Sequence, residues 1–305
     1  MRLAPALRDL PALNGVGASR VVIAPAQWAC VLDFLLARFP HISAEDWQQR
    51  LAQGLVLGDE GQPLQADTPA TDGGWLYYYR AVESETAIPF THQVLYRDAH
   101  LLVVDKPHFL PVIPSGQYLQ HTLLLRLKQS LNLPDLVPIH RIDRDTAGLV
   151  LFSLQAESRD AYSALFRERR VAKTYEAVAP FDAALAMPQR RESRIRVGAH
   201  FMQQAEVPGP VNAMTDIDVL EVCGPWARYR LRPLSGQRHQ LRVHMMALGL
   251  PILNDGIYPQ LTPEGSSDPA KPLQLLAKSL AFEDPVSRRR LVFESQLHLL
   301  PLPAV

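Results

Sequence analysis

The sequence predicts a mixed α+β protein with a small N-terminal module and a larger second domain. Patterns typical of helices and patterns typical of strands both occur along the chain. A length of 305 residues is enough for one large domain with an appendage. The 47% hydrophobic and 20% charged residues are usual for a soluble globular protein.

Three regions are expected. Prolines and glycines interrupt any helix near the N-terminus, so we assign residues 1–27 to an extended arm. Residues 28–85 form a small module, and residues 90–305 form the main domain.

The module is expected to contain two helices followed by short strands. Apolar residues recur at helical spacing from Trp28 to Phe39, and Ser43 with Asp46 is typical of the N-terminal cap of a second helix. Strand-like runs follow near residues 55–61 and 74–80.

Strand-like patterns dominate the main domain. Alternating or continuous apolar runs predict strands, whereas apolar residues at helical spacing predict helices. In order, we expect strands within 94–106, a helix over 123–131, a strand over 149–152, a helix over 156–170, strands over 171–178, 190–196, 217–222 and 227–232, and a helix opened by Gly236 and closed by Gly249.

Charged side chains gather in residues 139–148, directly before the apolar run of residues 149–152. Asp143 lies close to Arg141 and Arg144, and guanidinium groups keep a carboxylate ionised and oriented. Such a carboxylate can act as a nucleophile or a general base. A salt-bridged surface turn would give the same spacing, so spacing alone leaves both interpretations open.

The same stretch resembles a motif of the RluA family of pseudouridine synthases. His140, Arg141 and Asp143, followed by Thr146, match the family's H-R-L-D-x-x-T-S-G segment, in which the aspartate is catalytic. The resemblance implies that Asp143 is the catalytic residue. It also implies that His140, Arg141 and Thr146 bind substrate.

Three more segments resemble motifs of this family in the same order. A strand ending in Lys106 and Pro107 resembles the opening motif, which shapes the pocket wall. Lys173 and Tyr175 resemble the K-x-Y motif, whose tyrosine is expected to stack on the target base and to assist a later proton transfer. Residues 235–244 resemble the segment T-G-R-x-H-Q-I-R-x-H.

One position departs from the family pattern. The family has an arginine directly after the glycine of this last motif, paired with the catalytic aspartate, whereas this chain has Gln237. The partner of Asp143 is then Arg238, Arg242 or Arg141. Arg238 and Arg242 are four residues apart and are expected to share one helix face, from which both would bind substrate.

The module resembles a degenerate S4 RNA-binding module, because helix, helix and strand follow in that order. Such modules carry basic residues on the second helix, whereas this helix begins with Ala44-Glu45-Asp46. Residues 28–82 contain three arginines and seven carboxylates, whereas residues 167–242 contain thirteen Lys and Arg and eight Asp and Glu. RNA contacts are therefore expected in the later region, and whether the module binds RNA stays open.

The resemblance implies a twisted, mostly antiparallel central sheet with flanking helices. It also implies an enzyme that isomerises a uridine of ribosomal or transfer RNA to pseudouridine without a cofactor. No metal is expected, because Cys30 and Cys223 cannot form a CxxC pair and the histidines lack zinc-ligand spacing. No apolar run reaches 18 residues, so no membrane span is expected. A cytoplasmic enzyme is expected, with a monomer as the default.

Two alternatives to this function remain. A catalytically inactive RNA-binding protein of the same fold would be expected to lose Asp143, which is present. A glycoside hydrolase could use Asp143 and Asp145 as its two carboxylates, and release of free base or sugar would identify it.

Overall fold

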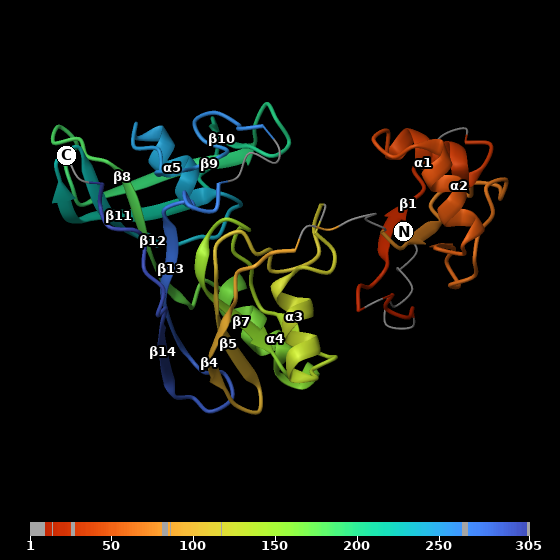
Figure 1. Ribbon diagram of the computed structural model, residues 1–305, viewed down its shortest axis with the longest axis horizontal. Coiled ribbons are helices and arrows are strands. Elements are labelled where there is room, and N and C mark those ends of the chain that lie inside the picture. The colour runs from red at the N-terminus through yellow and green to blue at the C-terminus, as the bar shows by residue number, and fades with distance from the viewer. Residues whose placement is uncertain are drawn as a thin grey trace. The chain divides into compact units, whose positions relative to one another are not determined.

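The computed structural model describes residues 10–13, 15–25, 28–80, 85, 87–116, 118–263 and 268–303. The chain divides into two compact units (Figure 1). The smaller unit comprises Met1–Glu85 and Pro114–Gln120, and the larger unit comprises Thr86–Ile113 and His121–Val305. The smaller unit therefore includes a short segment from the middle of the chain.

The smaller unit is a three-stranded antiparallel sheet with two helices. Its elements are β1 (Ser19–Val22), α1 (Val31–Arg38), α2 (Ala44–Ala52), β2 (Val56–Leu57) and β3 (Trp75–Tyr78), with strand order β1-β3-β2. As predicted, Ser43 caps α2, because its Oγ accepts a hydrogen bond from the backbone N–H of Asp46 at 3.0 Å. Phe34, Trp47 and Leu76 are buried together in the core.

Strand β1 lies in the segment that we expected to be a separate arm. Ser19 pairs with Tyr78 and Val22 with Trp75, so these residues belong to the sheet of the smaller unit. A four-residue strand is too short for a clear alternating pattern, which is why the sequence alone did not indicate it. The resemblance of this unit to S4 modules stays a prediction.

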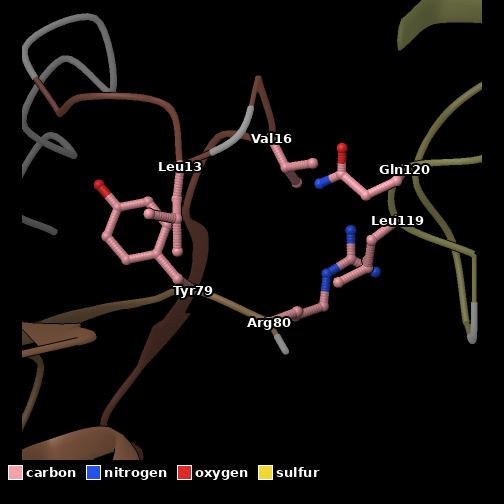
Figure 2. Close-up of a pocket in the computed structure, with 6 residues that line it drawn as sticks. All are labelled: Leu13, Val16, Tyr79, Arg80, Leu119 and Gln120. Atoms are coloured by element: carbon pink, nitrogen blue, oxygen red, sulfur yellow. The ribbon is translucent and has the colours of Figure 1, made fainter. Parts of the chain in front are cut away.

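A small pocket in the smaller unit brings its N-terminal segment, the end of β3 and the mid-chain segment together (Figure 2). The Tyr79 hydroxyl donates to the Pro11 carbonyl oxygen at 2.5 Å, and Arg80 Nη2 donates to the Pro114 carbonyl oxygen at 3.2 Å. These bonds join three parts of the chain that are distant in sequence. The lining residues are Leu13, Val16, Tyr79, Arg80, Leu119 and Gln120.

The larger unit is built on one eleven-stranded sheet, with strand order β10-β9-β11-β12-β8-β13-β7-β5-β4 and with β14 and β6 paired to β13 and β7. Only β7 and β13 pair in parallel among the described strands, which confirms the predicted mostly antiparallel α+β fold. None of the helices in the described residues is long and apolar enough to cross a bilayer. The elements are β4 (Gln93–Arg97), β5 (Leu101–Lys106), α3 (Leu123–Leu131), β6 (Val137–Pro138), β7 (Ala147–Ser153), α4 (Ala156–Arg167), β8 (Ala172–Pro180), β9 (Gln189–Val197), β10 (Gln204–Val207), β11 (Ala213–Cys223), β12 (Trp226–Pro233), α5 (Gln240–Ala247), β13 (Leu275–Glu283) and β14 (Arg290–Glu294).

Strand β7 is buried on both faces, because one face packs against α4 and the other against α3. Leu149 and Leu151 pack in the cluster that contains α4 residues, whereas Val150 and Phe152 pack in the cluster that contains α3 residues. This division follows from the alternation of side chains along a strand. The buried strand gives rigid support to the loop that precedes it.

Gly148 lies where β7 and β13 come very close. Its φ is +109°, and an added Cβ would lie 2.3 Å from the carbonyl oxygen of Ala277. We expect Gly148→Ala to lower the free energy of unfolding by at least about 2 kcal/mol in chemical denaturation, because sheet backbone cannot move aside. Gly249→Ala is the matched control, since Gly249 has φ +76° but no neighbour within 4 Å. If both variants lost the same free energy of unfolding, the clash with Ala277 would not contribute to the destabilisation of Gly148→Ala.

Candidate active site

Asp143 lies in the loop between β6 and β7. The backbone N–H of Thr146 donates to the Asp143 carbonyl oxygen at 3.2 Å and closes a turn. The Asp143 side chain is 30% exposed, so solvent reaches part of the carboxylate. Together with the support of β7, this turn presents a fixed carboxylate at the surface of the larger unit.

Arg242 of α5 is the partner of Asp143. Its Nη1 donates to Asp143 Oδ2 at 3.1 Å, while its Nε and Nη2 donate to the two oxygens of Asp255 at 2.7 and 2.6 Å. The side chains of Arg242 and Asp255 are 2% and 1% exposed. A bidentate pair with a buried carboxylate fixes the plane of the guanidinium, and its Nη1 amino group is then directed at Asp143.

Tyr258 and His239 surround this ion pair. The Arg242 guanidinium lies 5.3 Å from the centre of the Tyr258 ring, and the Tyr258 hydroxyl lies 3.0 Å from His239 Nδ1. His239 Nε2 is 3.8 Å from Asp143 Oδ1. Burial lowers the pKa of His239 to about 4 although Asp143 opposes the shift, so the imidazole is neutral at pH 7.

The balance of these groups keeps Asp143 ionised. Burial raises the pKa of its carboxyl, but protonated His239, Arg242 with its charge and hydrogen bond, and Lys106 lower the pKa by more. At pH 7, where His239 is neutral, the buried Arg242 supplies the positive charge next to the carboxylate. An ionised and oriented carboxylate is what a nucleophile or a general base requires.

Lys106 at the end of β5 links the opening motif to the loop of Asp143. Its side chain is fully buried, and its Nζ donates to the carbonyl oxygens of Pro107 and Arg144, each at 2.9 Å. Burial lowers the pKa of Lys106 to about 7, although the charges of Asp145 and Asp143 oppose the shift. The sequence placed this lysine only in the pocket wall.

The shifted pKa of Lys106 predicts how stability depends on pH. The pKa of Lys106 is about 7 in the folded protein and 10.5, the ordinary value, in the unfolded chain. Between these two pH values the amine is more protonated in the unfolded chain than in the folded protein. The free energy of unfolding should therefore rise with pH in this range, by up to about 1.4 kcal/mol per unit from Lys106. Chemical denaturation at pH 7, 8 and 9 tests this against Lys106→Met, which should lack that rise. Parallel curves for the two proteins would contradict it.

Tyr175 lies on β8, opposite Leu231 of β12 and Ala277 of β13. Burial, and then the charge of Asp143, raise the pKa of its phenol, so the hydroxyl stays protonated at neutral pH. The structure thus brings Tyr175 and Asp143 close enough to interact electrostatically.

Of the other predicted substrate-binding residues, His140 and Thr146 contact the protein itself. His140 Nε2 accepts a hydrogen bond from the backbone N–H of Leu151 at 3.2 Å, and its ring stacks on Phe166 at 4.4 Å. Thr146 is 2% exposed. Both residues support the loop of Asp143, whereas Arg141 is exposed.

Arg238 and Arg242 do not share a helix face, so this prediction was wrong. Helix α5 begins only at Gln240, because the preceding residue, His239, has a left-handed backbone conformation with φ +56°. Arg238 therefore lies outside the helix. Arg242 points inward, whereas the exposed Arg238 donates to the carbonyl oxygens of Phe201 and Met202 at 3.2 and 3.3 Å.

The arrangement suits carboxylate chemistry with a fixed cation. Sequence reasoning had not assigned Lys106, His239 or Asp255 to the site. No group of three or more His, Cys, Asp or Glu side chains in the described residues could hold a metal ion.

Comparison with known proteins supports the same interpretation. The profile of the RNA pseudouridylate synthase family matches residues 100–247. The chain is 32% identical over 236 residues to an uncharacterised RNA pseudouridine synthase of Synechocystis sp., covering 75% of this chain and 79% of that protein. It is 31% identical over 207 residues to the dual-specificity RNA pseudouridine synthase RluA of Salmonella typhi, covering 66% of this chain and 91% of that protein.

Solved structures show the same fold. The structure of human RNA pseudouridylate synthase domain containing 1 aligns with a TM-score of 0.56 at 24% identity, covering 69% of this chain and 85% of that one. The larger unit therefore has the pseudouridine synthase fold. With its motifs, its fold and its relatives in agreement, the chain belongs to the RluA family of RNA pseudouridine synthases.

Proposed function

We propose that this isomerase uses Asp143 to convert a specific uridine of a folded ribosomal or transfer RNA to pseudouridine. The observation that carries the proposal is the Asp143–Arg242 ion pair, in which a partly exposed carboxylate is held ionised by a buried arginine. An inactive RNA-binding protein would need neither the carboxylate nor the buried Asp255 that orients Arg242.

The reaction moves the base from an N-glycosidic to a C-glycosidic bond. The bond from N1 of the base to C1′ of the sugar breaks, a bond from C5 to C1′ forms, and the proton lost from C5 is balanced by one gained at N1. Asp143 either attacks C1′ or removes a sugar proton. Tyr175, with its phenol protonated, offers a stacking face for the base and a hydroxyl for the later proton transfer.

RNA binding needs a flipped base and cations for the phosphates. Arg141 and Arg238 are exposed and adjoin the residues around Asp143. The positive charge of the arginines on β9 is partly neutralised, since Arg190 donates two hydrogen bonds to Asp216 at 2.6 and 3.1 Å. We therefore propose that the phosphates next to the target uridine are bound by arginines at the site rather than along the whole of β9.

The name of the Salmonella typhi relative, dual-specificity RNA pseudouridine synthase, supports RNA as the substrate and leaves room for more than one target. Recognition by RNA shape is typical when bases must be splayed from a folded molecule. We propose a monomeric cytoplasmic enzyme that acts on such a folded RNA.

A transcriptome-wide pseudouridine map tests the proposal. Total RNA from cells that lack the gene, and from the same cells complemented with wild type or Asp143→Asn, is labelled with a carbodiimide and sequenced. One or a few sites should disappear on deletion and return only with wild type. Restoration by Asp143→Asn, or a map unchanged by deletion, would refute the proposed role.

A further inference from the structure

The tip of the β9–β10 hairpin carries an aromatic ring that the reaction described above does not use. Phe201 is 72% exposed, more than any other large hydrophobic residue among those described. A single exposed apolar residue is common in proteins and has no significance alone. Here the backbone around the ring is held by hydrogen bonds with Arg238 and Tyr258, two residues that lie next to the active site.

Arg238 holds the tip from the side of the active site. Its guanidinium donates to the carbonyl oxygens of Phe201 and Met202, and its neighbour His239 lies 3.8 Å from Asp143. Within the tip, the Gln203 N–H donates to the His200 carbonyl oxygen at 2.9 Å. The exposed ring therefore projects from an ordered turn.

The base of the hairpin is held by the tyrosine that contacts the catalytic ion pair. The Gln204 N–H donates to the Tyr258 hydroxyl at 2.7 Å, and Gln203 Nε2 donates to the Ile257 carbonyl oxygen at 2.9 Å. Tyr258 also lies against Arg242, the partner of Asp143. The backbone of the hairpin tip is thus linked to the residues around Asp143 both through Arg238 and through Tyr258.

The charges around the ring suit a polyanion. Arg196 lies on β9 close to the turn, opposite Ala205, and Arg238 contacts the tip itself. The carboxylate of Glu206 on β10 is already paired with Arg191. Aromatic rings among arginines are typical of surfaces that bind unpaired nucleotides, because the ring stacks on the base while the cations contact phosphates.

We propose that Phe201 stacks on an unpaired base of the substrate RNA next to the target uridine, so that the β9–β10 hairpin helps to select the substrate. The proposal rests on the proposed function and deepens it, since a flipped uridine leaves neighbouring bases without their stacking partners. The proposed partner is RNA rather than protein, because the exposed Arg196 and Arg238 next to the hairpin tip can contact the phosphates on either side of a stacked base.

The test measures tritium release from RNA labelled at C5 of uridine and isolated from cells that lack the gene. Phe201→Ala should raise the half-saturating RNA concentration about 5-fold or more and should leave the rate at saturation unchanged. Phe201→Trp should restore binding and Phe201→Leu should not, because leucine is apolar but has no aromatic face. Val292→Ala, which changes a residue 62% exposed on β14, is the matched control and should behave as wild type.

A half-saturating concentration for Phe201→Ala within twofold of wild type would overturn the proposal. Wild-type behaviour of Phe201→Leu would also overturn it and would indicate an apolar contact, as with a protein partner. Asp143→Asn in the same assay tests the catalytic proposal separately, because its retained activity would refute the role of Asp143 while leaving the comparison at Phe201 intact. Substitution of so exposed a side chain should leave folding unchanged.

Discussion

Asp143→Asn is expected to form pseudouridine at least about 10³-fold more slowly than wild type in single-turnover experiments. The amide keeps the shape of the carboxylate, but it has no negative charge with which to attack the sugar or to accept its proton. The fold should persist, because Arg242 retains its bidentate pair with Asp255. Tritium release from RNA labelled at C5 of uridine measures the rate, and thermal denaturation checks the fold.

Asp145→Asn is the matched control for this experiment. Asp145 lies two residues away in the same loop, but its carboxylate pairs with Arg144 at 2.8 Å rather than with Arg242. Its substitution should change the rate by only a few fold. Equal losses in both variants, or release of free uracil by wild type, would favour a pair of carboxylates that acts in hydrolysis.

The strands and helices of the larger unit could be predicted because their patterns are local. The run at 149–152 became β7, buried throughout, and the helix predicted at 123–131 was found at the same residues. Helix α5 starts four residues later than predicted, since nothing in the local pattern indicates the left-handed conformation of His239. Short β1 was missed because its identity as a strand depends on its partner β3.

The site could be predicted only in part. The motif indicated Asp143, but it left Arg141, Arg238 and Arg242 as possible partners. Which arginine pairs with Asp143 depends on its burial and on its contact with Asp255. Asp255 holds Arg242 in place from 13 positions away along the chain, a contact that sequence spacing does not reveal. Lys106 was likewise placed only in the pocket wall, because the two carbonyl oxygens that bind it become neighbours only in the folded chain.

Arg242→Met is expected to lower the free energy of unfolding by about 3 to 5 kcal/mol and to reduce activity severely. The stability loss follows because Asp255, only 1% exposed, would keep its charge without its cation. Activity falls because Asp143 would lose the group that orients it. With this cation removed, the pKa of Asp143 should rise, so the acid side of the pH–rate profile should move to higher pH.

A double variant separates these two effects of Arg242. Adding Asp255→Asn to Arg242→Met removes the buried charge, so it should recover much of the lost stability in chemical denaturation. It should not recover pseudouridine formation, because Asp143 still lacks its cation. Arg242→Lys keeps a positive charge but cannot bind two carboxylates in the same geometry, so its activity should fall between those of wild type and Arg242→Met. If activity returned together with stability in the double variant, the arginine would act only through folding, and the ion pair with Asp143 would have no part in catalysis.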